Sequence, residues 1–195
     1  MSYILGLTGS IGMGKSTTAA MLAQMGLPVW DADGAVHRLY DAGGGAVAPI
    51  AQLVPHAIVN GGLDRGALRA AIAENPALLA QIQTIVHPLV AQDRAEFIAS
   101  TNAPIIVLDI PLLFEIGADA LCDGVIVVTA PPEDQRARVL ARGISAADFD
   151  LLLSRQMPDA EKQSRATWVV HTTSPAHVAE DLARILAQIK GRPHA

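Results

Sequence analysis

The fold of this chain is decided by the stretch Gly9-Ser10-Ile11-Gly12-Met13-Gly14-Lys15-Ser16, which fits the pattern G-x-x-x-x-G-K-[ST]. In this pattern the glycines let successive backbone N–H groups turn toward one phosphate-sized hollow, where side chains would collide with the anion. The lysine then reaches the β- and γ-phosphates of a nucleotide, and the hydroxyl that follows it binds Mg²⁺. The stretch therefore predicts a phosphate-binding loop (P-loop).

The residues on either side of the loop support this interpretation. Residues 3–7 form an apolar run that predicts a buried strand, and residues 17–23 predict a helix. The loop would then lie at a helix N-terminus, where the helix dipole also favours an anion. The residues expected to bind ATP are Gly9, Gly12, Met13, Gly14, Lys15, Ser16 and Thr17.

The composition excludes several classes of protein. Of the 195 residues, 51% are hydrophobic and 17% are charged, which favours a folded domain with a buried core over disorder. The net charge is −5 without a run of basic residues, so we expect no nucleic-acid partner. Cys122 is the only cysteine, which excludes an intramolecular disulfide and a cysteine metal site. The sequence shows no targeting segment and no membrane-spanning apolar run, so the cytoplasm is the expected location.

The order of apolar runs predicts a parallel α/β fold. Helical stretches, including residues 132–142 and 175–190, separate the runs. Besides the first strand, four are expected: a short one ending at Asp31, then residues 105–109, 124–129 and 168–171.

The interval from residue 34 to 102 breaks this rhythm and is expected to contain no strand. Helical patterns at residues 67–74, 76–86 and 90–100 alternate there with Gly43-Gly44-Gly45 and Asn60-Gly61-Gly62. We expect a helical lobe over residues 37–102, inserted into a core made of residues 1–36 and 103–195. In an open α/β sheet, ligands bind at the carboxyl ends of the strands, so this lobe is placed to hold a second substrate.

Two acids, Asp31 and Asp33, follow the second strand. A carboxylate at this edge of the sheet could accept the proton of an attacking hydroxyl group. The alternative is a turn followed by a helix N-cap. Because the two acids flank one alanine, only one of them is expected to face a reaction.

Two further acids follow the third strand. Asp109 ends that strand, at the position of a carboxylate that assists Mg²⁺ binding, so Ser16 and Asp109 are the expected metal ligands. Glu115 is either a second acid near the metal or substrate, or an exposed loop acid. The six histidines lack metal-ligand spacing, so Mg²⁺ arriving with the nucleotide is the expected metal.

Arginines cluster after the fourth strand, where guanidinium groups could stabilise the charge of a moving phosphoryl group. Arg138 is expected on a solvated helical face, whereas Arg142 and Arg155 flank a polar connection at residues 143–150. This connection predicts a lid, over roughly residues 133–165, that excludes water. His87 precedes Pro88, which we expect to end one helix or begin the next.

Taken together, these motifs resemble the dephospho-CoA kinase family. The segments that carry the resemblance span nearly the whole chain: residues 6–16; Asp31-Ala32-Asp33 with His37; Gly62-Leu63-Asp64-Arg65; Ile85-Val86-His87-Pro88; Pro111-Leu112-Leu113-Phe114-Glu115; and Arg155-Gln156-Met157-Pro158 with Glu161-Lys162. The chain departs from the family at Leu152, four residues before Gln156, where an arginine is usual.

The resemblance implies a three-layer P-loop NTPase-type core with a five-stranded parallel sheet, a helical substrate-binding insertion and a lid. It also implies transfer of the γ-phosphate of ATP to the ribose 3′-hydroxyl of dephospho-CoA, the last step of coenzyme A biosynthesis. The catalytic residues would be Asp33, as general base, with Lys15 and Arg142. The substrate-binding residues would be Asp33, Arg65, His87 and Leu112.

Two other functions share part of this pattern. A nucleoside or nucleoside-monophosphate kinase would also have the P-loop, the lid and the helical lobe. A regulatory GTP-binding switch usually carries Asn-Lys-x-Asp, which this chain lacks. We expect a small-molecule substrate, and a monomer or weak homo-oligomer.

Overall fold

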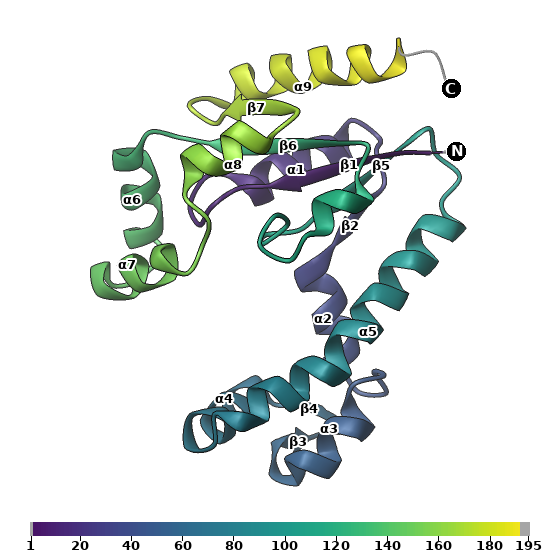
Figure 1. The fold of residues 1–195 in the computed structure, drawn as a ribbon, viewed down its shortest axis with the longest axis vertical. Coiled ribbons are helices and arrows are strands. Elements are labelled where there is room, and N and C mark those ends of the chain that lie inside the picture. Colours follow the sequence, from purple (N-terminus) through teal and green to yellow (C-terminus); the bar gives the residue numbers. More distant parts are fainter. Residues whose placement is uncertain (1, 192–195) are drawn as a thin grey trace. The chain divides into compact units, whose positions relative to one another are not determined.

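The computed structural model describes residues 2–191 of the chain (Figure 1). The chain divides into two compact units. The first combines the chain up to Val29 with the chain from Asn102 onward, and the second is Trp30–Thr101. The second unit therefore begins seven positions before the lobe boundary expected at residue 37.

A five-stranded sheet with the order β2-β5-β1-β6-β7 organises the fold. Strand β1 pairs in parallel with β5 and β6, and β6 pairs in parallel with β7. The loops that follow these strands therefore meet at one edge. The predicted five-stranded parallel α/β sheet is confirmed. The strands are β1 (Tyr3–Thr8), β2 (Val29–Asp31), β5 (Ile105–Asp109), β6 (Gly124–Thr129) and β7 (Trp168–His171).

The two faces of the sheet are covered by different elements. Helices α1 (Lys15–Gln24) and α9 (Pro175–Lys190) share one buried core with alternate strand residues such as Leu5 and Leu7. In α9 the buried residues recur at helical spacing, which gives the helix one apolar face. A side chain at Gly6 would project from the opposite face of the sheet, where its Cβ would lie 2.9 Å from the Cys122 Sγ atom. The short helix η2 (Ala118–Leu121) lies next to this cysteine in the sequence.

The segment expected to form the lid contains helices α6 (Pro132–Leu140), α7 (Ala146–Ser154) and α8 (Asp159–Arg165). Helix α6 ends two residues earlier than predicted. The polar connection expected over residues 143–150 is largely helical instead. The hydroxyl of Ser145 accepts the N–H of Asp148 at 3.1 Å and thereby caps the start of α7.

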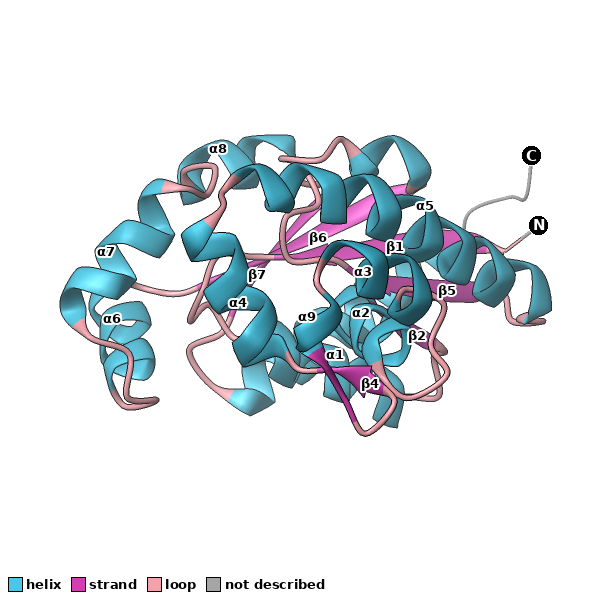
Figure 2. Ribbon diagram, turned by 90° about the horizontal axis from the view of Figure 1, so that it is seen from below, coloured by secondary structure: helices cyan, strands magenta, loops and turns pink. Residues whose placement is uncertain are grey.

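The second unit is a helical body with one small hairpin (Figure 2). The prediction of a strand-free insertion is wrong, because Ile58–Val59 and Gly62–Leu63 pair in antiparallel fashion. Asn60 and Gly61 have φ angles of 53° and 80°, which suit the tight turn of a two-residue hairpin. The elements are α2 (Ala32–Tyr40), α3 (Val47–Leu53), η1 (Pro55–Ala57), β3 (Ile58–Val59), β4 (Gly62–Leu63), α4 (Arg65–Glu74) and α5 (Ala77–Ser100).

Helix α5 continues through Pro88, so the predicted helix boundary there is also wrong. A proline inside a helix removes one backbone hydrogen bond and costs about 3 kcal/mol. Packing on both sides of the proline offsets this cost. Ile82 and Val86 are buried before it, and Leu89 and Val90 pack against the same core after it.

Within the second unit, Asp93 fixes α2 and the residue two positions before it against α5. Its Oδ1 atom accepts hydrogen bonds from Trp30 Nε1 and from Arg38 Nη2, each at 2.7 Å. Burial raises the pKa of Asp93, but the hydrogen bonds from Arg38 and Trp30 outweigh burial and lower the pKa below its ordinary value. These contacts hold the helix that carries Asp33. No helix among residues 2–191 combines the length and the apolar character needed to span a bilayer.

Candidate active site

The P-loop connects β1 to α1 and has the backbone geometry of an anion cradle. Gly12 and Gly14 adopt φ angles of 78° and 89°, in the left-handed region that glycine tolerates. Gly9 lies so close to β6 that an added Cβ would be 2.8 Å from the carbonyl oxygen of Val128. The glycines therefore allow both the turn of the loop and its close packing against β6.

The side chain of Met13 points into the core. Met13 is 3% exposed, and its sulfur accepts the N–H of Ala130 at 3.1 Å. The hydroxyl of Thr172 donates to the Met13 carbonyl at 2.9 Å. A large apolar residue inside the loop thus serves as its anchor.

Lys15 and Asp109, predicted from separate stretches of sequence, come together in the structure. The Lys15 Nζ atom lies 2.8 Å from Asp109 Oδ1, and the two side chains are 14% and 7% exposed. Ser16 and Thr17 are exposed on the first turn of α1. The Ser16 hydroxyl and the Asp109 carboxylate are hard oxygen donors of the kind that Mg²⁺ prefers.

Arg142 lines a cavity of about 210 Å³ beside the first turn of α1, together with Gly14 and Thr17. Arg138, one helical turn earlier, lines the same cavity. It donates to the hydroxyl of Thr172 at 2.9 Å and to its carbonyl oxygen at 2.7 Å. The prediction of a solvated face for Arg138 is wrong, because the loop after β7 supplies two acceptors that the local sequence does not reveal.

Glu115 is half-buried, so the alternative of an exposed loop acid is wrong, and its place near a metal or substrate stays a prediction. Its Oε1 atom lies 2.8 Å from the Nζ atom of Lys162, whose side chain is completely buried. The same oxygen accepts the N–H of Met157 at 2.9 Å. This contact ties the loop after β5 to the start of α8.

We expect Glu115→Ala to lower the free energy of unfolding by about 3–5 kcal/mol, because Lys162 would remain buried without a counter-charge. Urea denaturation monitored by circular dichroism measures this loss. The matched control is Glu115→Leu combined with Lys162→Met, which removes both charges and should recover most of the stability. A single Glu115→Ala variant as stable as the wild type would contradict the importance of the pair.

The same contact gives stability a defined pH dependence. Burial raises the pKa of Glu115, but the hydrogen bond and charge of Lys162 and the Met157 N–H outweigh burial, so the folded-state pKa lies below the ordinary 4.5. The contribution is complete above pH 4.5 and is lost as the pH falls through the folded-state pKa. In Glu115→Gln, that acid-dependent part of the unfolding free energy should be absent.

The second unit has a cavity of about 460 Å³ between α2 and α4. Asp31 caps α2, since its Oδ1 atom accepts the N–H of Asp33 at 3.0 Å. The carboxylate of Asp33 lines the cavity. The N-cap alternative is therefore confirmed for Asp31, and the catalytic role of Asp33 stays a prediction.

Basic and aromatic residues share the lining of this cavity with Asp33. Arg65 lies over the ring of Tyr40, with 5.8 Å from its guanidinium carbon to the ring centroid. Burial raises the pKa of Tyr40, and the charge of Arg65 acts in the opposite direction. Arg69 and His37 also line the cavity. The sequence prediction missed Arg69 and Tyr40, although Arg69 follows Arg65 by four residues and so falls on the same helix face.

Two other predicted substrate residues lie elsewhere. His87 is exposed on α5 and is not among the residues lining the cavity of the second unit. Leu112 belongs to the loop after β5 in the first unit and is 39% exposed. Their roles remain predictions. Within the described part of the chain, no cluster of three or more histidine, cysteine or acidic side chains is arranged to hold a metal.

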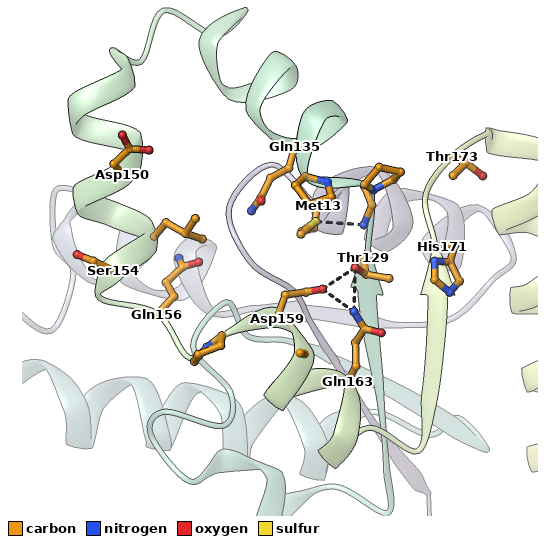
Figure 3. A pocket seen from close by; sticks show the side chains of 16 residues that line it. Met13, Thr129, Gln135, Asp150, Ser154, Gln156, Asp159, Gln163, His171 and Thr173 are labelled. Atoms are coloured by element: carbon orange, nitrogen blue, oxygen red, sulfur yellow. Dashed lines mark hydrogen bonds between the residues drawn. The ribbon is translucent and has the colours of Figure 1, made fainter.

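A third cavity, of about 980 Å³, lies among helices α6, α7 and α8 and the ends of β6 and β7 (Figure 3). Asp159 is one of the polar residues that line this cavity. Its Oδ2 atom accepts hydrogen bonds from the Thr129 hydroxyl at 2.7 Å and from the Gln163 amide at 2.6 Å. These bonds fix α8 to the end of β6. Gln135 and Gln156 line the same cavity from α6 and from the segment after α7.

Comparison with known proteins agrees with this geometry. The family model for dephospho-CoA kinase matches residues 3–177. A protein of Jannaschia sp. named dephospho-CoA kinase is 60% identical over 191 residues, which cover 97% of this chain and 98% of that protein.

Solved structures show the same fold. The crystal structure of a Thermus thermophilus protein matches with a TM-score of 0.86 and 38% identity, covering 97% of this chain and 99% of that one. A dephospho-CoA kinase from Campylobacter jejuni matches with a TM-score of 0.69 at 21% identity, over 97% of this chain and 99% of that one. The P-loop core, the family match and the identity over nearly the full length agree, and the chain is a kinase that belongs to the dephospho-CoA kinase family.

Proposed function

We propose that this kinase transfers the γ-phosphoryl group of ATP to the ribose 3′-hydroxyl of dephospho-CoA. The observation that carries the proposal is the cavity of the second unit, where Asp33 shares the lining with Arg65 and Arg69. A carboxylate beside two guanidinium groups suits an acceptor that presents both a hydroxyl group and phosphates. Dephospho-CoA carries a ribose hydroxyl and a diphosphate, so it satisfies both requirements.

On the donor side, the P-loop holds the phosphates of ATP. The left-handed Gly12 and Gly14 let the loop turn around one anion, and α1 adds its dipole. Lys15 supplies a positive charge at the phosphates. Arg142 and Thr17 line a cavity beside the same turn, and from there Arg142 would reach the phosphates.

Magnesium fits the donor site because Ser16 and Asp109 offer oxygen ligands near Lys15. When bound with ATP, the ion would neutralise phosphate charge. This chain's contribution is to present those oxygens at the end of β5 and at the first turn of α1.

The reaction then assigns a role to each group. Asp33 accepts the proton of the 3′-hydroxyl, the hydroxyl oxygen bonds to the γ-phosphorus, and the bond from that phosphorus to the bridging oxygen breaks to release ADP. Lys15 and Arg142 stabilise the charge that spreads over the transferred group. Arg65 and Arg69 hold the acceptor diphosphate with paired donors. The lid over residues 133–165 excludes water, which would otherwise accept the phosphoryl group.

The test is an acceptor assay. The enzyme is incubated with ATP and Mg²⁺ and with dephospho-CoA, nucleosides or nucleoside monophosphates, and products are identified by mass and by phosphorus NMR. We expect one added phosphate on dephospho-CoA, at the 3′ position. Phosphorylation of nucleosides or monophosphates with dephospho-CoA inert would show the competing kinase function instead.

The arginines of the acceptor cavity give a more specific prediction. We expect Arg65→Met and Arg69→Met each to raise KM for dephospho-CoA roughly 10- to 100-fold, because each removes charged hydrogen bonds to phosphate. KM for ATP should change less than about twofold. The matched control is Arg184→Met on α9, whose side chain is 65% exposed and pairs with Asp181. Equal effects of all three variants on dephospho-CoA would contradict the assignment.

A further inference from the structure

Two residues of the lid segment, Gln135 and Gln156, bind the same residue of the P-loop. At the start of the segment, the side-chain amide of Gln135 donates to the carbonyl oxygen of Ile11 at 2.8 Å. Between α7 and α8, the side-chain oxygen of Gln156 accepts the N–H of Ile11 at 3.1 Å. The two glutamines are 21 positions apart, with α7 and most of α6 between them, and they meet at one residue of the loop.

The two contacts are complementary in chemistry. Gln135 acts as a donor and Gln156 as an acceptor, so together they satisfy both backbone groups of Ile11. A neutral side-chain amide can bind these backbone groups beside a phosphate site without adding charge. Rotation of either peptide unit that flanks Ile11 would break one of the two bonds. The loop is therefore held in one backbone conformation by groups outside it.

Each glutamine is itself anchored. Gln135 is 5% exposed in the first turn of α6. Gln156 precedes Met157, whose N–H binds Glu115, the partner of the buried Lys162. Both side chains therefore reach Ile11 from fixed positions.

The two lid helices between the glutamines are linked to each other. Arg136 on α6 pairs with Asp150 on α7 at 3.0 Å. The same guanidinium group lies 5.6 Å from the centroid of the Phe149 ring. A displacement of α6 and α7 is thus transmitted to the two residues that hold the loop.

We propose that Gln135 and Gln156 are positioning residues that keep the P-loop in its phosphate-binding shape and couple that shape to the lid. The loop binds phosphate only in the conformer whose amides converge, and the apparent dissociation constant rises as the fraction of that conformer falls. The proposal rests on the proposed nucleotide function of the loop. It predicts that the lid contributes to nucleotide affinity through contacts with the protein as well as through contacts with the ligand.

The experiment compares Gln135→Met and Gln156→Met, which remove the amides at nearly constant side-chain volume. Calorimetry measures the dissociation constant for a non-hydrolysable ATP analogue with Mg²⁺, and steady-state assays give kcat and KM for ATP. We expect the dissociation constant and KM to rise roughly five- to tenfold in each variant, with kcat at saturating ATP within about threefold. The matched control is Gln163→Met, which removes an amide that lines the same cavity and binds Asp159. The control should bind the analogue like the wild type.

A second pair of variants uses the direction of the hydrogen bonds. Gln156→Glu keeps an acceptor for the Ile11 N–H, whereas Gln135→Glu places an acceptor against the Ile11 carbonyl. Both variants add one negative charge near the loop. The difference between their dissociation constants therefore measures the effect of losing the hydrogen bond to Ile11. We expect Gln135→Glu to bind the analogue at least about fivefold more weakly than Gln156→Glu.

The outcomes separate the two proposals. A wild-type enzyme that binds no nucleotide would overturn the proposed function. A wild type that binds, with both methionine variants binding equally well, would overturn the positioning role alone. A role in folding only would lower the melting temperature and leave the dissociation constant unchanged. If the methionine variants fail to fold, hydrogen exchange in the wild type decides, because an unprotected Ile11 amide without nucleotide would contradict the proposal.

Discussion

Asp33→Asn should lower kcat for dephospho-CoA phosphorylation by about 10²–10⁴, because asparagine cannot accept the proton of the attacking hydroxyl. The substitution preserves the shape of the side chain and therefore tests the carboxylate alone. ATP binding should survive, because the P-loop belongs to the other compact unit of the chain. Steady-state kinetics with both substrates, together with calorimetric ATP binding, separates the chemical step from affinity.

The matched control lies two residues away. Asp31→Asn makes the same chemical change in the residue that caps α2. Asparagine is as good an N-cap as aspartate, so helix stability and kcat should both stay near the wild-type values. Near-normal turnover of Asp33→Asn, or an equal loss in Asp31→Asn, would remove Asp33 from the role of general base.

Lys15→Ala should lower kcat/KM for ATP by about 10²–10³, since it removes the positive charge that meets the β- and γ-phosphates. The variant also removes the ion pair of Lys15 with Asp109 at 2.8 Å, so some loss of stability is expected. Thermal unfolding with and without ATP and Mg²⁺ distinguishes the two effects. At about 100 times its dissociation constant, a ligand stabilises the native state by about 2.7 kcal/mol, and the variant should lose this shift.

Lys190→Ala is the control for Lys15→Ala, because Lys190 is exposed at the end of α9. It should retain both turnover and the thermal shift. A Lys15→Ala enzyme with unchanged kinetics would contradict the assignment of the P-loop itself.

The core of the fold could be predicted from the sequence because its signals are local. The strands at Ile105–Asp109 and Gly124–Thr129 have the predicted bounds, since each is a short apolar run bordered by proline or a polar residue. The P-loop stretch is likewise continuous, and its backbone requirements are visible as glycines. Such patterns need no knowledge of distant partners.

Features that depend on tertiary contacts were not predicted. The continuity of α5 through Pro88 requires the buried core on both sides of the proline. The β3–β4 hairpin is two residues long in each strand, too short for alternation to be recognised, although Asn60-Gly61 was a signal for its turn. Arg138 is held by Thr172, and nothing in the local sequence of α6 indicates that partner.

The candidate site shows the same division. The sequence singled out Asp33 and Asp31 together, but only the cap geometry shows which carboxylate is left for the cavity. Arg69 was missed because an arginine on a helix is usually exposed to solvent, and its spacing from Arg65 was not used. The roles of His87 and Leu112 were inferred from resemblance, and they need the acceptor bound before they can be tested.

The buried pair of Glu115 and Lys162 also limits how this sequence can change over time. Either single loss leaves one unpaired charge, at a cost of about 3–5 kcal/mol, against a total stability of about 5–15 kcal/mol for a typical domain. A lineage that starts from this pair would therefore cross an intermediate that has lost about a fifth or more of its stability before it reached an apolar pair. We expect related sequences to carry both charges or neither, so these two distant positions are inherited as one unit.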